Sequence, residues 1–378
     1  MAKSRTKLDM ADKCDRTYKI KMDKKIVFMD LTALYGRKWT GIERYSIILL
    51  KAISELEGIN LYKICRVSNC FPNYGKTLVI PFKKRILAEQ IFIPIILIIK
   101  KPNIVIFPCF PPAPIVYLLK YILNFRIFVI IHDTVIWNYA ETLSLKAKIY
   151  LKPLYNIAIK RADVILTVSE YVANELRKLS SRCIVNISNS IGHEYENVDD
   201  IDTDILIRLN LKPEEYFLTV STLEPRKNLG YLIELFEKLK NYEKNIKLII
   251  VGKKGWGASY LMSKIKDKRD IIWLGYIPIE DLITLYKYCD SFILLSLYEG
   301  FGLPPLEALA CGARIIVSDI PIFKETVGNY GIYIPLNNMD KAINIIRQRK
   351  NKKKEKVNIY NAVRYKKIIK ETFVSILK

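Results

Sequence analysis

Short runs of β-branched residues alternate with helical patterns along this 378-residue chain, from Lys25 almost to its end. This alternation is typical of βαβ units and predicts α/β domains with parallel sheets. In the first half we expect helices at 42–56 and 171–179 and strands at 26–29, 104–107, 127–131 and 164–168. In the second half we expect strands at 216–221, 247–251, 271–274, 292–296 and 315–317.

The length fits two domains, since one domain usually takes roughly 100–200 residues. A polar stretch from Glu194 to Asp204 interrupts the alternation and predicts a linker. The expected parts are a basic flexible tail (1–24), a Rossmann-like domain (25–192), the linker (193–212), a second Rossmann-like domain (213–356) and a final helix (357–378). Two open parallel sheets in tandem would present the carboxyl ends of their strands to a common crevice, where ligands bind.

Positive charge is concentrated in the first half. The formal net charge is +23, and residues 1–190 hold 31 Lys and Arg against 14 Asp and Glu. Between Gly58 and His132 the only acidic residue is Glu89. Such a surface attracts anions, namely nucleic acid, phosphorylated substrates or an acidic membrane. The aliphatic run from Ile91 to Ile99 favours the membrane, and basic residues flank it: Lys83, Lys84, Arg85, Lys100 and Lys101.

Three further features bear on the compartment. The seven cysteines are scattered without a Cys-x-x-Cys spacing, which indicates a reducing cytosol. The first 25 residues carry charges throughout and show no signal peptide. The run from Ile91 to Ile99 is far shorter than the roughly 20 residues that a spanning helix needs. We therefore expect a cytoplasmic protein.

The segment from Leu295 to Gly312 has the richest set of candidate site residues. It follows a predicted strand, and Pro304 suits the first turn of a helix. The turn Gly300, Phe301, Gly302 and Leu303 would let backbone N–H groups approach an anion such as a pyrophosphate. Before it, Glu299 could touch a group beyond the phosphates, and Glu307 could accept hydrogen bonds from a ribose. The alternative is a capping loop in which Glu307 only favours the helix dipole.

Two cations follow the first strand of the second domain. Arg226 can bind phosphate oxygens in a bidentate manner, and Lys227 can neutralise a leaving diphosphate. Gly252 and Lys253, after the next strand, are a weaker candidate of the same kind, and a surface turn is an equal alternative. Two basic residues in a loop are usually just solvated, but their place at a strand's carboxyl end favours phosphate binding.

In the first domain, Gly41 opens a helix where a dinucleotide-binding fold has its glycine loop. His132 and Asp133 follow an apolar strand and should face the crevice, although a lone histidine is often structural. The Asp-x-Asp spacings at 200–202 and 202–204 lie in the predicted linker, so we interpret them as solvated, and we expect no bound metal.

The stretch from Glu299 to Glu307 resembles the E-x7-E motif of the retaining GT-B glycosyltransferases of family 4. The resemblance extends in order through Ser221–Leu229, Val251-Gly-Lys, Leu274-Gly275 and Ala310–Ala313. It is looser in the first domain, at Thr40–Tyr45, His132-Asp133 and Thr167–Glu170. Asn189-Ser-Ile191 departs from the Asn-Gly-Val that the family commonly shows.

The resemblance implies a GT-B fold, with two Rossmann-like domains facing across a cleft and the last helix packing back on the first. It implies metal-independent hexosyl transfer with retention from a nucleotide-diphosphate sugar, such as GDP-mannose or a UDP-hexose, which is a co-substrate and not a resident cofactor. Arg226 and Lys227 would hold the diphosphate and Glu299 the sugar. By the same resemblance, Glu307 would bind the ribose, Gly41 would donate to the diphosphate, and His132 would contact the sugar.

These observations predict a cytoplasmic transferase, peripheral to the inner face of the cell membrane. Its partners would be a nucleotide-sugar donor and a lipid-linked saccharide acceptor in bacterial O-antigen or capsule synthesis. One alternative is a nucleotide-sugar epimerase, which would alter the sugar without an acceptor. A basic nucleic-acid-binding protein is a second, but no aromatic-interleaved basic stripe supports it.

Overall fold

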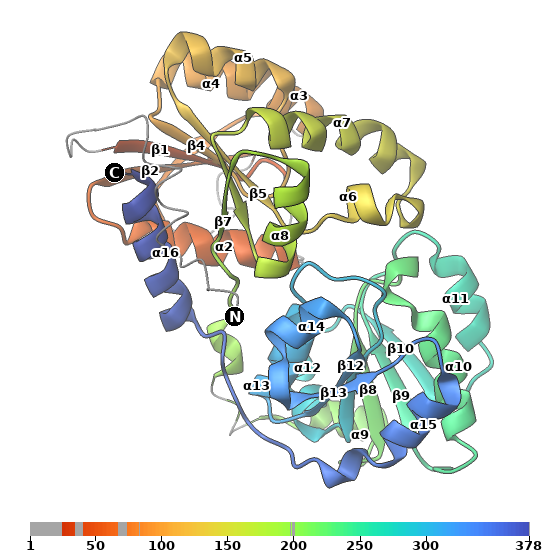
Figure 1. Cartoon of the computed structure of the whole chain (residues 1–378). Coiled ribbons are helices and arrows are strands. Elements are labelled where there is room, and N and C mark those ends of the chain that lie inside the picture. The colour runs from red at the N-terminus through yellow and green to blue at the C-terminus, as the bar shows by residue number, and fades with distance from the viewer. Residues whose placement is uncertain are drawn as a thin grey trace, which may run out of the picture. The chain divides into compact units, whose positions relative to one another are not determined.

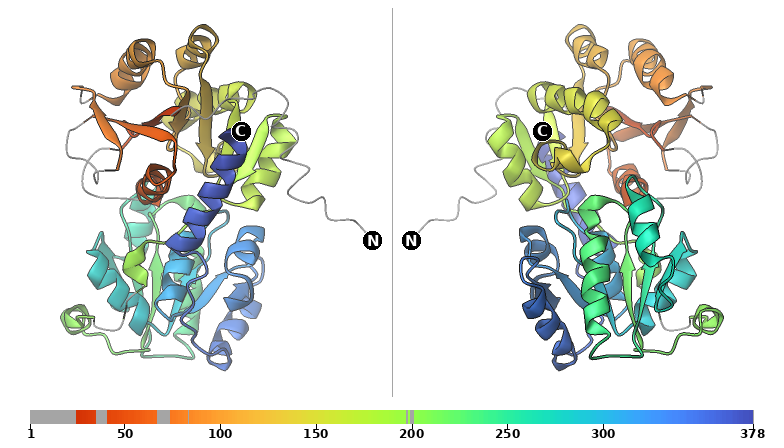
Figure 2. Two further views of the ribbon diagram at one scale, coloured as in Figure 1. Left: turned by 90° about the vertical axis from the view of Figure 1, so that its left-hand side faces the viewer. Right: turned by 90° about the vertical axis from the view of Figure 1, so that its right-hand side faces the viewer.

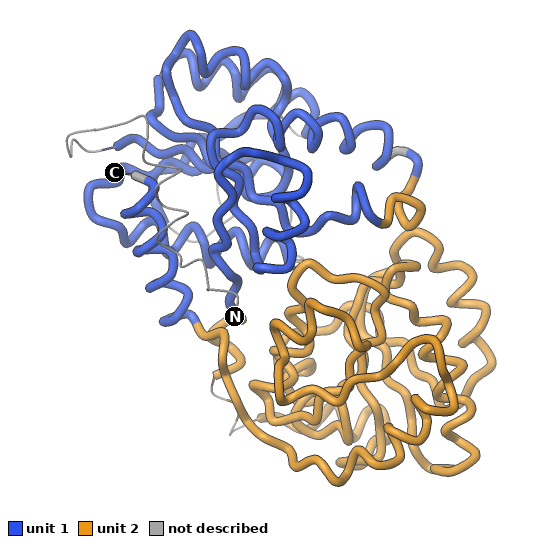
Figure 3. Tube along the Cα trace, viewed as in Figure 1, with its two compact units in different colours: residues 1–138, 145–190, 362–378 blue, residues 139–144, 191–361 orange. Residues whose placement is uncertain are grey.

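The chain forms two compact units, each built around its own parallel sheet. The computed structural model describes residues 25–34, 41–66, 74–82, 84–196, 198 and 201–377. Unit 1 comprises residues 1–138, 145–190 and 362–378, and unit 2 comprises residues 139–144 and 191–361 (Figure 3). The expected basic tail, together with Thr40, Lys83 and Asp200, lies outside the described residues.

Unit 1 contains a seven-stranded parallel sheet in the order β3-β2-β1-β4-β5-β6-β7 (Figure 1). The four strands expected from sequence are present, and three more join them. The strands are β1 (Lys25–Asp30), β2 (Ile59–Cys65), β3 (Lys76–Val79), β4 (Ile104–Phe107), β5 (Arg126–Ile131), β6 (Val164–Thr167) and β7 (Cys183–Asn186). The central strands β4, β5 and β6 are apolar because both of their faces are covered.

Helices cover both faces of this sheet. On one face α4 (Ile93–Lys100), α5 (Pro114–Leu123), α7 (Leu145–Arg161) and α8 (Glu170–Leu179) share a core with alternate strand residues. The chain reaches α4 through α3 (Arg85–Leu87) and the π-helical turn η1 (Ala88–Phe92), and α6 (Val135–Asn138) follows β5. The other face carries α2 (Gly41–Ser54) and the last helix, α16 (Ala362–Leu377).

The last helix packs on unit 1, as expected. It contacts α2, from which it is separated by most of the sequence (Figures 1 and 2). Phe373 is fully buried against Phe128 of β5, with 6.2 Å between ring centroids. Arg126 also donates from Nη1 to the carbonyl of Ile376 at 2.7 Å. The final helix therefore completes the core of the first unit.

Unit 2 contains a six-stranded parallel sheet in the order β10-β9-β8-β11-β12-β13. The five expected strands are present and one more is added. The strands are β8 (Tyr216–Val220), β9 (Lys247–Val251), β10 (Ile271–Gly275), β11 (Ser291–Leu294), β12 (Arg314–Ser318) and β13 (Gly331–Ile334). Both units thus have the doubly wound, Rossmann-like architecture that the alternation predicts.

The helices of unit 2 are also divided between two faces. On one face, α10 (Leu229–Leu239), α11 (Ala258–Ile265) and α15 (Met339–Arg347) share a core with alternate strand residues. On the other, α12 (Ile279–Tyr288) contacts α13 (Leu303–Ala310). The remaining short elements are η2 (Ala140–Thr142), η3 (His193–Tyr195), α9 (Asp204–Arg208), η4 (Pro225–Lys227), α14 (Pro321–Thr326), η5 (Gly328–Tyr330) and η6 (Arg349–Asn351).

The stretch expected to be a linker, 193–212, lies within unit 2. Its helix α9 packs on α12, and Tyr195, Ile205 and Leu206 are buried. The acidic residues up to Asp204 suggested a free linker, but the buried Ile205 and Leu206 that follow them attach the stretch to the unit.

Two other observations concern the cysteines and the membrane. Cys65, Cys109, Cys289 and Cys311 are buried free thiols, whereas Cys183 is disulfide-bonded, which the spacing did not predict.

No helix in the described ranges combines the length and apolar character that crossing a membrane requires.

Candidate active site

The candidate site of unit 2 lies where its strand order reverses. Strand β8 is flanked by β9 on one side and β11 on the other, so the connections that leave β8 and β11 diverge. A crevice outside the carboxyl ends of the strands at such a point is where ligands bind in doubly wound sheets. Arg226 and Lys227, in η4, follow β8, and Glu299 follows β11. The topology therefore brings these three residues to one edge of the sheet.

The side chains of Glu299, Arg226 and Lys227 are in direct contact. Lys227 Nζ donates to Glu299 Oε1 at 2.6 Å, and Arg226 Nη1 donates to Glu299 Oε2 at 3.0 Å. Ser296 Oγ also donates to Glu299 Oε1, at 2.7 Å. A second carboxylate, Glu224, accepts from Arg226 Nη2 at 2.7 Å. The two cations that sequence predicted as phosphate ligands are thus held by two carboxylates in a fixed cluster.

Burial and the neighbouring charges act on the pKa values of Glu299 and Lys227 in this cluster. Burial alone would raise the pKa of Glu299, but the charges of Lys227 and Arg226 prevail and lower it to about 2. Burial lowers the pKa of Lys227, as does the neighbouring guanidinium of Arg226, and Glu299 partly offsets both effects. Arg226 and Lys227 are partly buried beside carboxylates. The local dielectric is low there and strengthens each electrostatic interaction, so the two cations are suited to bind an anion.

Glu307 is the second glutamate of the motif, and it lies one turn inside α13. It is buried, and its Oε2 accepts a hydrogen bond from the hydroxyl of Tyr286 in α12 at 3.0 Å. The pKa of Tyr286 is raised well above its ordinary value by burial and then by Glu307, so its hydroxyl keeps its proton and remains a donor. The carboxylate is therefore oriented by a neighbouring helix and does more than favour the helix dipole.

The turn between the two glutamates is tightly packed. Gly302 has a φ of +83°, and a Cβ at this position would lie 2.6 Å from a ring carbon of Phe323. Phe301 is buried edge-on against Tyr360, at 5.1 Å between centroids, so its side chain serves the packing of unit 2. Gly300 is buried, and Leu303 begins α13 without a side-chain cap. The Phe301 side chain is therefore engaged in packing, and a ligand at this turn would meet the backbone of its glycines.

Gly252 and Lys253 follow β9 at the same edge of the sheet. Gly252 has a φ of +143°, and a Cβ there would lie 1.9 Å from the carbonyl oxygen of Ser221. This close approach accounts for the glycine by packing alone. The Lys253 ammonium lies 5.7 Å from the centroid of the Tyr276 ring. The contribution of either residue to phosphate binding stays a prediction.

The candidates of unit 1 lie at the carboxyl edge of its own sheet. His132 follows β5, and its Nε2 lies 2.6 Å from the carbonyl oxygen of Pro108, after β4. Because a carbonyl only accepts, Nε2 carries the proton and Nδ1 has the lone pair. Burial lowers the pKa of His132, which favours this neutral form. Gly41 is the exposed first residue of α2.

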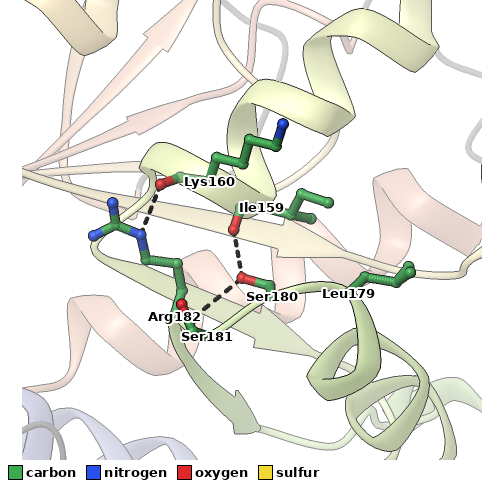
Figure 4. Close-up of a pocket in the computed structure, with 6 residues that line it drawn as sticks. All are labelled: Ile159, Lys160, Leu179, Ser180, Ser181 and Arg182. Carbon is green, nitrogen blue, oxygen red and sulfur yellow. Dashed lines mark hydrogen bonds between the residues drawn. The ribbon is translucent and has the colours of Figure 1, made fainter.

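One hollow elsewhere in unit 1 contains none of the expected residues. It has a volume of about 300 Å³ and is lined by Ile159, Lys160, Leu179, Ser180, Ser181 and Arg182 (Figure 4). Its polar groups bond to each other: Ser180 donates to the Ile159 carbonyl, and Arg182 Nε donates to the Lys160 carbonyl at 2.8 Å. It lies where α7 and α8 end and the chain enters β6 and β7, at the amino edge of the sheet. That is the wrong edge for a ligand of this fold class.

Sequence reasoning missed three residues that build the cluster and its surroundings: Glu224, Ser296 and Tyr286. Glu224 and Ser296 are close in sequence to Arg226 and Glu299, so proximity to the motif was an available signal. Tyr286 is separated from Glu307 by a whole strand, and only the packing of α12 against α13 reveals the pair. Among the described residues, no group of three or more His, Cys, Asp or Glu side chains is placed to hold a metal ion.

Known proteins resemble this chain in sequence and in fold. Residues 202–366 match the family model described as glycosyl transferases group 1. The chain is similar to O-antigen chain mannosyltransferase B of Escherichia coli, 30% identical over 217 residues, covering 55% of this chain and 57% of the relative. It is also similar to O-antigen chain mannosyltransferase RfbU of Salmonella typhimurium, 31% identical over 208 residues, covering 54% and 55%. The chain thus spans little more than half the length of these two relatives.

Among solved structures, Anabaena Alr3699/HepE in complex with UDP-glucose superposes with a TM-score of 0.67. The likeness covers 93% of this chain and 99% of that one at 17% sequence identity, so it concerns the fold. The comparisons show a GT-B-like fold for the chain and a similarity of residues 202–366 to group 1 glycosyl transferases. The narrower assignment to family 4 and its E-x7-E motif stays a prediction.

Proposed function

We propose that this protein transfers a hexosyl group from a nucleotide-diphosphate sugar to a lipid-linked saccharide in bacterial surface polysaccharide synthesis. The proposal depends on one observation: the buried Glu299 and the partly buried Arg226 and Lys227 form a single cluster at the switch point of a sheet that matches a glycosyltransferase model. Anion-binding cations beside a carboxylate are what an activated sugar requires, because the carboxylate can accept from sugar hydroxyls while the cations hold the diphosphate.

Each member of the cluster has a proposed part in the reaction. The diphosphate displaces Glu299 as the partner of Arg226 and Lys227, and the released carboxylate binds the donor sugar. As the bond between the anomeric carbon and the phosphate oxygen breaks, the two cations stabilise the charge that develops on the leaving diphosphate. The acceptor oxygen bonds to the anomeric carbon on the same face, and its proton goes to the leaving phosphate oxygen. The configuration is retained and no metal is needed.

The remaining predicted contacts concern the nucleotide and the sugar. Glu307, which Tyr286 orients, is proposed to accept hydrogen bonds from the ribose hydroxyls. The backbone around Gly302 is proposed to approach the diphosphate. In unit 1, Gly41 is proposed to donate its N–H to the diphosphate. His132 is proposed to contact the sugar through Nδ1, because its Nε2–H is engaged by Pro108.

A mannosyl donor is the first choice, because the two relatives described above are named as O-antigen mannosyltransferases. GDP-mannose is therefore the donor to test first, and UDP-glucose the second, since the structural neighbour was solved with it. The same relatives favour O-antigen synthesis over capsule synthesis. With a lipid-linked acceptor, the enzyme would lie peripherally at the inner face of the cell membrane.

A thermal-shift panel of nucleoside diphosphates and their sugars tests donor binding. A ligand at 100 times its dissociation constant stabilises the protein by about 2.7 kcal/mol, which a melting curve resolves easily. We expect GDP and GDP-mannose to raise the melting temperature of the wild-type protein. Lys227→Ala should greatly reduce this shift, because it removes one of the two cationic contacts with the diphosphate.

Transfer itself is measured with a radiolabelled donor and lipid extract as acceptor. Glu299→Ala should lower the rate at least 100-fold, a loss typical of removing a charged contact from the reacting centre. Glu237→Ala, at an exposed glutamate of α10 that pairs with Lys268 and not with the cluster, is a control that should retain the activity. Full activity of Glu299→Ala would refute the proposal. Conversion of the nucleotide sugar without any acceptor would identify an epimerase instead.

A further inference from the structure

Two neighbouring helices of unit 1 expose apolar side chains on their outer sides. Each helix buries some of its side chains against the sheet: Ile93 and Leu97 in α4, and Val116 and Leu119 in α5. The two helices contact each other and lie side by side on the same face of the sheet (Figures 1 and 2). Their outer surface, which we name the α4–α5 face, consists of Ile95, Ile98, Ile99, Leu118, Tyr121 and Ile122.

This pattern is unusual for a helix that covers a sheet. Such a helix normally has one apolar stripe towards the core and polar residues on its outer side. Here both sides of both helices are apolar, and the exposed fractions reach 68% at Ile99 and 77% at Ile122. Single exposed apolar residues are common, but a contiguous group on adjacent helices marks a surface that is covered by a partner.

The charges around the α4–α5 face are of one sign. Lys100 and Lys101 lie at the C-terminal end of α4, Lys84 lies just before α3, and all three are exposed. The only carboxylate between Gly58 and His132, that of Glu89, is buried and bonded to Arg85 at 2.5 Å. The face therefore combines an apolar centre with exposed cations and has no exposed acidic residue on these elements.

A second copy of the chain is a poor partner for this surface. In a twofold dimer the same patch meets itself, so the lysines of one copy would pack on a surface that offers no exposed acid on these elements. An anionic lipid surface complements both properties at once, because its headgroups attract the lysines and its hydrocarbon accepts the isoleucines. Tyr121 also fits, since tyrosine favours the boundary between headgroups and hydrocarbon.

We propose that the α4–α5 face inserts into the headgroup region of an anionic membrane. This inference rests on the peripheral location in the proposed function and assigns it to particular residues, including a helix, α5, that the sequence did not single out. Helices α4 and α5 end where the chain enters β4 and β5, so Ile99, Lys100 and Ile122 lie towards the amino edge of the sheet, opposite the edge that carries His132.

Sedimentation of the full chain with lipid vesicles tests the assignment. We expect binding to vesicles that contain phosphatidylglycerol and much weaker binding to phosphatidylcholine alone. Each basic residue near such a surface contributes about 1 kcal/mol, or about fivefold. The triple variant Lys84→Gln, Lys100→Gln and Lys101→Gln should therefore bind on the order of 100-fold more weakly. Leu118→Ser with Ile122→Ser should lower binding at least ~10-fold, because it removes two inserted apolar side chains.

The chain provides a matched control in Ile207, on α9 of unit 2. Its exposed fraction is 76%, against 77% for Ile122, so Ile207→Ser changes an equally exposed isoleucine outside the face. This variant should bind as the wild type does. Because all the substituted side chains are exposed, melting temperatures should stay unchanged and misfolding would not account for a loss.

Three results would overturn the assignment: no wild-type binding to the anionic vesicles, equal binding to both vesicle types, or undiminished binding by the face variants. Concentration-dependent dimerisation that Leu118→Ser with Ile122→Ser abolishes would assign the surface to a second copy instead. The vesicle assay contains no nucleotide sugar and the thermal-shift panel contains no lipid. Failure of one inference therefore leaves the other standing.

Discussion

At the scale of single residues, the site depends on partners that hold functional groups in place. Glu299 is fixed by three donors, and Glu307 receives a hydrogen bond from Tyr286, a residue with no place in the sequence motif. A carboxylate that must accept from a sugar hydroxyl needs its orientation set beforehand, because each rotamer frozen on binding costs affinity. Tyr286 is therefore expected to act as a positioning residue for Glu307.

The substitution Tyr286→Phe tests this role. It removes the hydrogen bond to Glu307 but keeps the ring that packs on Phe292, 5.7 Å away between centroids. A buried hydrogen bond to a charged group contributes about 1.5–3 kcal/mol. We expect KM for the donor to rise about tenfold with kcat little changed, measured by initial rates over a range of donor concentrations.

Tyr216→Phe is the matched control. Tyr216 is equally buried in unit 2, and its hydroxyl donates to the carbonyl of Leu285 at 2.9 Å and not to Glu307. This variant should lose stability in thermal melts but keep the KM of the wild type. If both variants changed KM alike, the effect would come from general loosening of the unit and Tyr286 would have no positioning role.

At the scale of helices and strands, the alternating pattern predicted the strands with continuous apolar runs, such as Ile104–Phe107. It missed β2, whose run includes Lys63, a lysine that is only 2% exposed. It also missed β3, β7 and β13, which are four residues each and lie at the edges of their sheets. Edge strands are covered less, so their sequences show a weaker apolar signal.

The site, too, was predicted in part and missed in part. The order of motifs along the chain was enough to predict that Glu299, Arg226 and Lys227 share a sheet edge, because parallel strands end there together. The contributions of Glu224, Ser296 and Tyr286 depend on side-chain rotamers and helix packing, which no spacing in the sequence specifies. The α4–α5 face was foreseen only for its first helix, since the apolar character of α5 is also what a buried helix would show.

The close approach of two loops at Gly252 predicts a large effect of one methyl group. Its φ of +143° is a conformation that other residues rarely adopt, and a Cβ would lie 1.9 Å from the Ser221 carbonyl oxygen. Gly252→Ala must therefore move the loop after β8, which leads into Arg226 and Lys227. We expect a loss of at least about 2 kcal/mol in denaturant unfolding, together with a weaker thermal shift by nucleotide.

Gly328→Ala is a control that separates the cost of a positive φ from the cost of a steric clash. Gly328 also has a positive φ, +56°, but nothing lies within 4 Å of its Cβ position. This variant should lose only about 1 kcal/mol, the cost of the left-handed conformation, and keep its nucleotide response. Equal losses in the two glycine variants would mean that the contact with Ser221 contributes little.

At the scale of the whole molecule, the chain passes between the two units several times. It leaves unit 1 after residue 138, returns at 145, leaves again after 190 and returns at 362 with the last helix (Figure 3). Each unit nevertheless has its own core around its own sheet. Unit 1 is therefore completed only when the end of the chain is in place, so its stability should depend on α16.

Phe373→Ala tests this dependence, because Phe373 is fully buried against β5 and belongs to α16. Removing a buried phenylalanine side chain costs about 3–5 kcal/mol. We expect amide hydrogen exchange to accelerate in β4, β5 and β6 while β8 and β11 of unit 2 keep their protection, since the lost contacts belong to unit 1. Val374→Ala, at a neighbouring position that is 45% exposed, should leave both sheets protected. Faster exchange in both sheets of Phe373→Ala would show that the two cores unfold as one, because independent units lose protection separately.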